Sequence, residues 1–457
     1  MKLYRKIYDE LLNWKNESRG KTALLIEGAR RIGKSTIVET FGQEQYKSYI
    51  LIDFRNVSKT IKDNFKNNLI PSKLNDFFNI IKVEYGKELY DRESLIIFDE
   101  VQKYPKAREA IKDLVKDGRF DYIETGSLIS IKENVKDIVI PSEEHKLKMY
   151  PLDFEEFLIA EGEQQLLNYI KEMSNKKKPL EDSFHKRAMY AFKEYMLIGG
   201  MPQSVIGYLE NNKDFRKADL AKREIIDLYR DDIKKASKKY NLKISRIFEN
   251  IPGFLSKHDK KIVLSSIDKE KTYSEYADPL FWLDDSMICN LCYKCSDPNI
   301  GLSLTKDDSF VKCYMGDTGL LVSLAFSENE LITEEIYKEI IHDNLSINKG
   351  MIYENSISQM LITLGNDLYF YTHYSEENHR NDIEVDFILS NMSKTNLKIH
   401  PIEVKSSKNY TTNSLDSFKK RFNQRIDQSY IIHPKQLSIQ ENCIKIPPYF
   451  VPFYHNC

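Results

Sequence analysis

Short apolar runs alternate with amphipathic segments through the first third of this 457-residue chain. Runs at 23–26, 48–54, 94–99 and 120–127 have the length of buried strands, and the charged segments between them show helical spacing. Strands that alternate with helices predict a mainly parallel, doubly wound α/β sheet. We therefore expect the chain to begin with an α/β domain.

The later hydrophobic pattern changes character more than once. From about 155 to 235 it is helical, with a break at 198–202, where two glycines and a proline must interrupt a helix. Helical positions followed by a strand pair near 287–293 and 310–315 suggest a winged-helix module, which binds DNA or packs against protein. The expected domains are an α/β core at 1–157, a helical lid at 158–238, a winged-helix-like segment at 239–325 and a second α/β domain at 326–457.

The first strand–helix turn carries a phosphate-binding pattern. Gly28-x4-Gly33-Lys34-Ser35 fits the Walker A motif, in which backbone N–H groups and the following helix N-terminus face phosphate oxygens. The motif predicts that Lys34 reaches the β and γ phosphates of ATP and that Ser35 holds Mg²⁺. A glycine-bearing turn without a ligand is the alternative. The predicted nucleotide-binding residues of the loop are Gly28, Ala29, Arg30, Arg31, Ile32, Gly33, Lys34, Ser35 and Thr36.

A second apolar strand ends in Asp99-Glu100, the Walker B arrangement, 65 residues after Lys34. We expect Asp99 to bind Mg²⁺ and Glu100 to polarise the attacking water as a general base. The next strand ends near Thr125 and Ser127, either of which is a candidate γ-phosphate sensor. A strand-ending turn with a helix N-cap is an equal alternative for each of them.

The C-terminal region carries a second group of acidic residues. Glu403 and Lys405 share one strand face, and Asp386 precedes Glu403 by 17 residues, as on the neighbouring strand of a hairpin. An Asp followed by Glu-x-Lys is the restriction-endonuclease-like pattern, which predicts catalysis by Asp386, Glu403 and Lys405. Asp386 and Glu403 would be Mg²⁺ ligands, with Glu354 as a further one. Exposed alternating charges on an edge hairpin are the competing interpretation.

Composition narrows the class of protein without selecting a partner. The 68 basic and 69 acidic residues nearly cancel, so net charge argues neither for nor against nucleic acid. No segment approaches the roughly 20 apolar residues of a membrane helix, and no signal peptide is evident, so we expect a cytoplasmic protein. Cys289, Cys292 and Cys295 interrupt a strand-like segment without a nearby histidine, which favours buried thiols over a metal site.

Taken together, these motifs resemble the AAA-type ATPases that carry a C-terminal domain of unknown function, DUF4143. The resemblance covers nearly the whole chain, and it implies ATP binding, a winged-helix segment after the lid and a restriction-endonuclease-like C-terminal fold. It rests on segments 28–35, 98–102, 124–127, 150–157, 198–202, 316–320, 349–355, 384–387 and 401–405.

One departure from the family pattern concerns assembly. Members often carry a Gly-Arg pair before the Tyr-Pro-Leu segment, whereas residues 140–146 here contain no arginine. Without such an arginine finger, cooperative hydrolysis in a ring lacks support, and Lys146 or Lys148 would lack the forked geometry.

Three functional hypotheses follow from these motifs. The first is an ATPase coupled to a metal-dependent nuclease. The second is an ATP-driven switch or DNA-binding protein whose C-terminal domain is a non-catalytic scaffold. The third is a signalling ATPase that binds protein.

Overall fold

The computed structural model describes the chain as two compact units. Unit 1 comprises residues 1–3, 151–284 and 288–457, and unit 2 comprises residues 4–150 and 285–287. The predicted core therefore extends a few residues past the division at Tyr150, and the finer division into lid, winged-helix-like segment and C-terminal domain stays a prediction. The residues not described are 127–142, 258–259, 263–273, 300, 329–333, 343–348, 378, 392–397, 441–442 and 454–457.

Unit 2 is built on a five-stranded sheet of order β2-β3-β4-β1-β5 whose neighbouring strands are all parallel. Since parallel strands end at the same edge, the turns after β1, β3 and β4 meet there. The sheet was predicted, except for β5. The elements are α1 (Ile7–Ser18), β1 (Ala23–Glu27), α2 (Lys34–Gln45), β2 (Ser48–Asp53), α3 (Lys59–Asn67), α4 (Leu74–Tyr85), β3 (Ser94–Asp99), α5 (Pro105–Asp117), β4 (Asp121–Gly126) and β5 (Glu144–Lys148).

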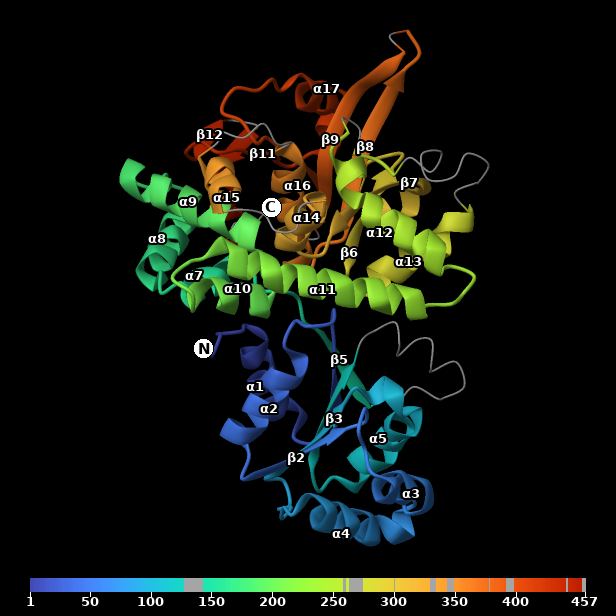
Figure 1. Ribbon diagram of the computed structural model, residues 1–457. Helices are drawn as coiled ribbons and strands as arrows, with labels where there is room; N and C mark the ends of the chain where they lie inside the picture. Colours follow the sequence, from blue (N-terminus) through green and yellow to red (C-terminus); the bar gives the residue numbers. More distant parts are fainter. Residues whose placement is uncertain are drawn as a thin grey trace. The chain divides into compact units, whose positions relative to one another are not determined.

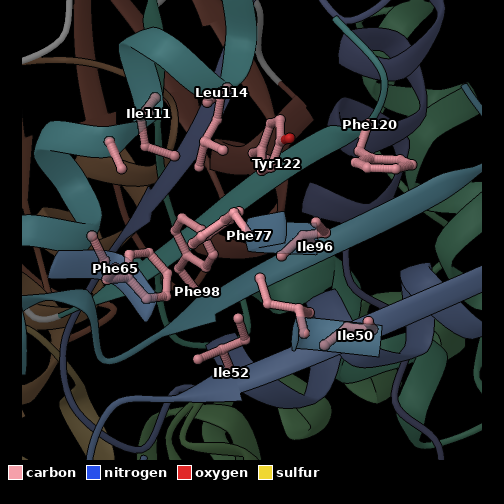
Figure 2. Close-up of a cluster of buried hydrophobic side chains, with 14 of the residues drawn as sticks. Ile50, Ile52, Phe65, Phe77, Ile96, Phe98, Ile111, Leu114, Phe120 and Tyr122 are labelled. Atoms are coloured by element: carbon pink, nitrogen blue, oxygen red, sulfur yellow. The ribbon is translucent and has the colours of Figure 1, made fainter. Parts of the chain in front are cut away.

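The core on one face of this sheet is rich in aromatic rings (Figure 2). Phe98 of β3 lies against Phe65 of α3 at 5.6 Å between ring centroids, and Phe65 meets Phe77 of α4 at 5.1 Å. Phe77 and Phe98 are fully buried. Burying such a ring contributes about 1.5–3 kcal/mol, so this cluster holds α3 and α4 on the sheet and fixes the end of β3.

Unit 1 contains a mixed eight-stranded sheet of order β12-β13-β11-β10-β9-β8-β6-β7 (Figure 1). The strand pair expected in the winged-helix-like segment is present as β6 (Cys289–Cys295) and β7 (Lys306–Met315), and β6 pairs with β8 of the C-terminal region. The predicted fold class, a parallel P-loop sheet with a second α/β domain, is confirmed. The other strands are β8 (Leu368–Ser375), β9 (Arg380–Asn391), β10 (Lys398–Val404), β11 (Ser429–Ile432), β12 (Ser438–Gln440) and β13 (Cys443–Ile446).

Helices surround this sheet, and α16 packs against β6, β7, β8 and β10 while α17 packs against β9. The segment 326–346, expected to be a polar connector, contains the short helix α15. The helices of unit 1 are α7 (Phe154–Ala160), α8 (Gln164–Asn175), α9 (Asp182–Ile198), α10 (Pro202–Leu209), α11 (Phe215–Lys235), α12 (Asn241–Leu255), α13 (Ser274–Asp285), α14 (Thr318–Ala325), α15 (Glu334–Ile341), α16 (Lys349–Thr363) and α17 (Asn413–Phe422).

The predicted break after α9 is a three-way backbone junction. Gly199 ends α9 with φ +78°, and the Gly200 N–H donates to Asp317 at 2.5 Å, while the Gly200 carbonyl accepts from the Leu152 N–H at 2.7 Å. A Cβ on Gly200 would lie 2.1 Å from the Leu152 oxygen, and one on Gly319 would lie 2.4 Å from the Ile198 oxygen. Glycine is therefore required where these three segments meet.

Candidate functional site

The loop between β1 and α2 has the geometry of a phosphate-binding turn. Arg31 and Gly33 both take left-handed φ values, 71° and 93°. A Cβ on Gly28 would lie 2.3 Å from the Ile32 side chain and 2.5 Å from the Met149 carbonyl oxygen, so only glycine fits there. The N-cap residue of α2 is Gly33, which has no side chain to cap the first turn. The N–H groups of this turn therefore remain directed at the loop, as an anion site requires.

Lys34 points back into this loop. Its ammonium donates to the carbonyl oxygens of Gly28 and Ala29, both at 2.8 Å. Desolvation lowers the pKa of Lys34 to about 8, although the nearby carboxylates of Glu100 and Asp99 act in the opposite direction. The charge thus lies inside the turn, where incoming phosphate oxygens would replace the carbonyl contacts.

Asp99 links the three predicted segments of the site. The Ser35 hydroxyl donates to Asp99 Oδ1 at 2.7 Å, and the Thr125 hydroxyl donates to the same oxygen. The Asp99 side chain is buried at the carboxyl end of β3, and Arg55 Nη2 lies 3.5 Å from its second oxygen. Carboxylate and hydroxyl oxygens side by side are a donor set that suits Mg²⁺. Ser127, the other predicted sensor, lies outside the described residues.

Glu100 follows Asp99 with a left-handed φ of 56°, which turns its side chain away from the strand path. Its carboxylate accepts a hydrogen bond from Gln102 Nε2 at 2.5 Å, and its N–H donates to the Thr125 hydroxyl at 3.4 Å. Gln102 was not predicted as a site residue, although it lies on the turn directly after the Walker B strand. It orients the predicted general base.

Two arginines missed by the sequence analysis also support this site. Arg5 is buried and donates to the Ile32 carbonyl at 2.9 Å and to the Tyr150 carbonyl at 2.5 Å, which ties the phosphate loop to the end of the core. Arg55 follows β2, the neighbour of β3, so strand order alone would have brought it to the correct edge.

The predicted loop residue Ile32 is itself buried, whereas Arg30 and Thr36 are exposed.

The second predicted group lies on neighbouring strands of unit 1. Asp386 on β9 accepts the Val404 N–H at 2.8 Å, and Lys405 donates to Glu403 Oε1 at 2.5 Å. Burial raises the pKa of Asp386 to about 6, with a contribution from the charge of Glu354, and burial raises the pKa of Glu403 to about 7. Among the described residues, the buried Glu403 Oε2 has no hydrogen-bond partner.

Lysines from elsewhere in the sheet neutralise the predicted third acid. The buried carboxylate of Glu354 pairs with Lys312 at 3.1 Å and also contacts Lys260 and the Tyr314 hydroxyl. Although burial raises its pKa, the charges of Lys260 and Lys312 prevail and lower it to about 2. Lys312 also lies 3.7 Å from Asp386 and 3.6 Å from Glu384, so one ammonium faces three carboxylates.

The described part of the chain holds no group of three or more His, Cys, Asp or Glu side chains arranged for a metal ion. Lysines thus contact all three predicted acids, and of their carboxylates only Glu403 keeps a buried oxygen, Oε2, without a hydrogen-bond partner among the described residues. Cys289, Cys292 and Cys295 are buried free thiols on β6. Strand alternation places Cys292 on the face opposite to the other two.

Three segments of the chain match known family models. Residues 20–158 match a family model described as an AAA domain, residues 189–331 match a domain of unknown function (DUF8612), and residues 349–449 match a domain of unknown function (DUF4143). The chain therefore contains an AAA-type P-loop ATPase domain and a DUF4143 domain. A comparison with curated proteins finds no match.

Some solved structures are similar to this chain at low sequence identity. The Walker-type ATPase PABY2304 of Pyrococcus abyssi is 16% identical with a TM-score of 0.43, over 71% of this chain and 96% of that one. AMPPCP-bound DnaA from Aquifex aeolicus is 14% identical with a TM-score of 0.27, over 75% and 93%. The Aeropyrum pernix ORC1 protein in complex with DNA is 11% identical with a TM-score of 0.27, over 72% and 93%. In the described residues, no helix has the length and apolar character needed to span a membrane.

Proposed function

We propose that unit 2 binds ATP with Mg²⁺ and hydrolyses it, and that the nucleotide state acts as a switch. The observation that carries this proposal is the contact of Ser35 and Thr125 with one oxygen of Asp99, beside the inward-pointing Lys34. Three segments far apart in the sequence supply the groups that ATP hydrolysis needs. A glycine-bearing turn that binds no ligand would not require residues from three segments to meet at one carboxylate.

Each residue has a distinct role in the proposed reaction. The N–H groups of residues 28–35 hold the phosphates, and Lys34 stabilises charge on the β and γ oxygens. Ser35 and Asp99 would hold Mg²⁺, which supplies charge neutralisation between the phosphates. Glu100, oriented by Gln102, positions and polarises the attacking water, and Thr125 senses whether the γ-phosphate is present.

Nucleotide binding and hydrolysis are tested with two substitutions. In isothermal titration with Mg²⁺ and ATP, we expect Lys34→Ala to lose binding, because the loop then lacks its cation. We expect Glu100→Gln to bind ATP as the wild type does and to release phosphate at least about 100-fold more slowly, as expected for a lost general base. Unchanged affinity in Lys34→Ala would overturn the proposal.

A second candidate function is metal-dependent cleavage of nucleic acid at Asp386, Glu403 and Lys405. The unpartnered, buried Glu403 Oε2 and the raised pKa values of both acids favour a cation between them. Lysine engagement of Glu354 instead favours a scaffold, the alternative we inferred for this domain. The bound metal would activate water for attack on a phosphodiester, with Lys405 stabilising charge at phosphorus.

Cleavage is tested with DNA and RNA, single- and double-stranded, in Mg²⁺ or Mn²⁺, with and without ATP. We expect Asp386→Ala to abolish any cut, while Asp382→Ala, on the same strand but paired with the half-exposed His373, is the matched control. Absence of cleavage in the wild type would leave the ATP-driven switch with a scaffold domain. Cytoplasmic location and assembly without an arginine finger stay predictions.

A further inference from the structure

A basic pocket in unit 1 is separate from both sites described above. Its volume is about 680 Å³, and its walls come from α9, the end of α15, the start of α16 and the turn after β10. The packing of α9 against α15 and α16 forms its frame (Figure 1). A cavity of this size accommodates a ligand far larger than a single ion.

Positive charge dominates the lining. Lys186 and Lys193 of α9, Lys349 of α16 and Lys408 after β10 all line the pocket, and none of its described lining residues is acidic. Lys186 and Lys408 are exposed, and neither forms an ion pair with another described residue. Lys193 is already oriented, because its ammonium donates to the Ile341 carbonyl at 2.8 Å. Lysines from three separate elements thus face one cavity.

Aromatic and hydroxyl groups complete the surface. Tyr190 is 45% exposed and lies on α9 between Lys186 and Lys193, while Ser406 and Ser407 offer hydroxyls beside Lys408. Lysines combined with an accessible aromatic ring are the combination that binds the backbone and stacks the bases of an unpaired nucleic-acid strand. A free phosphate group would not stack on the Tyr190 ring, and it is too small to contact lysines on separate elements at the same time.

We propose that this pocket binds a single-stranded nucleic acid, with phosphates on Lys186 and Lys408 and a base against Tyr190. The proposal goes beyond ATP hydrolysis and does not require cleavage. The pocket is adjacent in sequence to the second site, since Ser406 follows Lys405 and Glu354 follows the pocket residue Tyr353.

Binding is tested by fluorescence anisotropy of a labelled 12-nucleotide oligothymidine with the full chain. EDTA and the absence of ATP keep both proposed enzymatic activities silent. For Lys186→Gln with Lys408→Gln, we expect about 25-fold weaker binding at 0.1 M salt and a salt slope smaller by about 1.4, because about 0.7 is lost per phosphate contact to a single strand. Lys186→Arg with Lys408→Arg should retain binding, since both charges remain.

The matched control is Lys217→Gln with Lys238→Gln, which removes two exposed lysines of unit 1 that do not line the pocket. It should bind like the wild type. Equal affinity and salt slope in the pocket variant and the wild type would overturn the proposal, as would no binding by the wild type at 50 mM salt. If millimolar inorganic phosphate at constant ionic strength displaced the oligothymidine, the pocket would be assigned to small phosphate compounds. That result would overturn the proposal of single-strand binding.

Discussion

Lys312 is the residue whose removal tests the charge balance of unit 1 most directly. Its ammonium is fully buried and lies 3.1 Å from Glu354, 3.6 Å from Glu384 and 3.7 Å from Asp386. Replacing it with methionine retains most of the side-chain volume but leaves these carboxylates without one of their cations. Removing one partner of a buried ion pair costs about 3–5 kcal/mol.

The pKa of Glu354 gives a second magnitude for the stability that this charge pairing contributes. It falls from an ordinary 4.5 to about 2, because the two lysines outweigh the effect of burial. At about 1.4 kcal/mol per pH unit, this difference corresponds to about 3 kcal/mol of stability at neutral pH. Because the folded pKa is depressed, this contribution is complete above about pH 4.5 and is lost as the pH falls towards 2.

The assay is urea unfolding of the Trp14→Phe variant, in which Trp282 of α13 is the single remaining tryptophan and reports on unit 1. We expect Lys312→Met to lower the free energy of unfolding by about 3–5 kcal/mol at pH 7.5. The loss should shrink at pH 4.5, where the unpaired carboxyls take up protons. Adding Glu354→Gln should recover part of it. A cost below about 1 kcal/mol, or the same cost at both pH values, would refute the reasoning.

The remaining predictions concern the junction and the phosphate loop. Gly200→Ala should destabilise unit 1 by about 1–3 kcal/mol in urea unfolding, because its Cβ would meet the Leu152 oxygen at 2.1 Å, whereas Gly253→Ala, which meets nothing within 4 Å, should not. Arg5→Met should weaken ATP binding in isothermal titration by releasing the loop at Ile32; unchanged affinity would argue against that role. ATP affinity should be level below about pH 8 and fall above it, because Lys34 then loses its proton; a flat profile to pH 9.5 would contradict this.

Local sequence patterns were sufficient for the parallel sheet and its phosphate loop. Apolar runs of strand length, a glycine-rich turn and Asp99 at a strand end each report their environment within a few residues. The strand β5 was missed because Glu144–Lys148 alternates charged residues with few apolar ones, and its burial pattern is mostly exposed. The helix α15 was missed because its polar flanks dominate the composition of 326–346.

The sequence alone did not identify contacts between residues that lie far apart along the chain. Nothing in Lys312 distinguishes it from other lysines until β7 is placed in the sheet beside β6, which brings it to Glu354 across 42 residues of chain. The contact of Arg55 with Asp99 depends on the order of β2 and β3 in the sheet. The contacts of Arg5 with the phosphate loop depend on the path of the N-terminal segment. Such contacts follow from tertiary packing, which propensity and spacing do not encode.

The backbone junction at Leu152 determines where the chain can be cut. The Leu152 carbonyl accepts the Tyr195 hydroxyl at 2.9 Å, and its N–H is held by Gly200, so this residue is part of the unit that follows it. Phe154 adds a ring contact with Phe192 at 5.6 Å. A recombinant fragment starting at residue 158 would lack all of these contacts, whereas one starting at Pro151 would keep them. Independent expression of the C-terminal part therefore depends on including these seven residues.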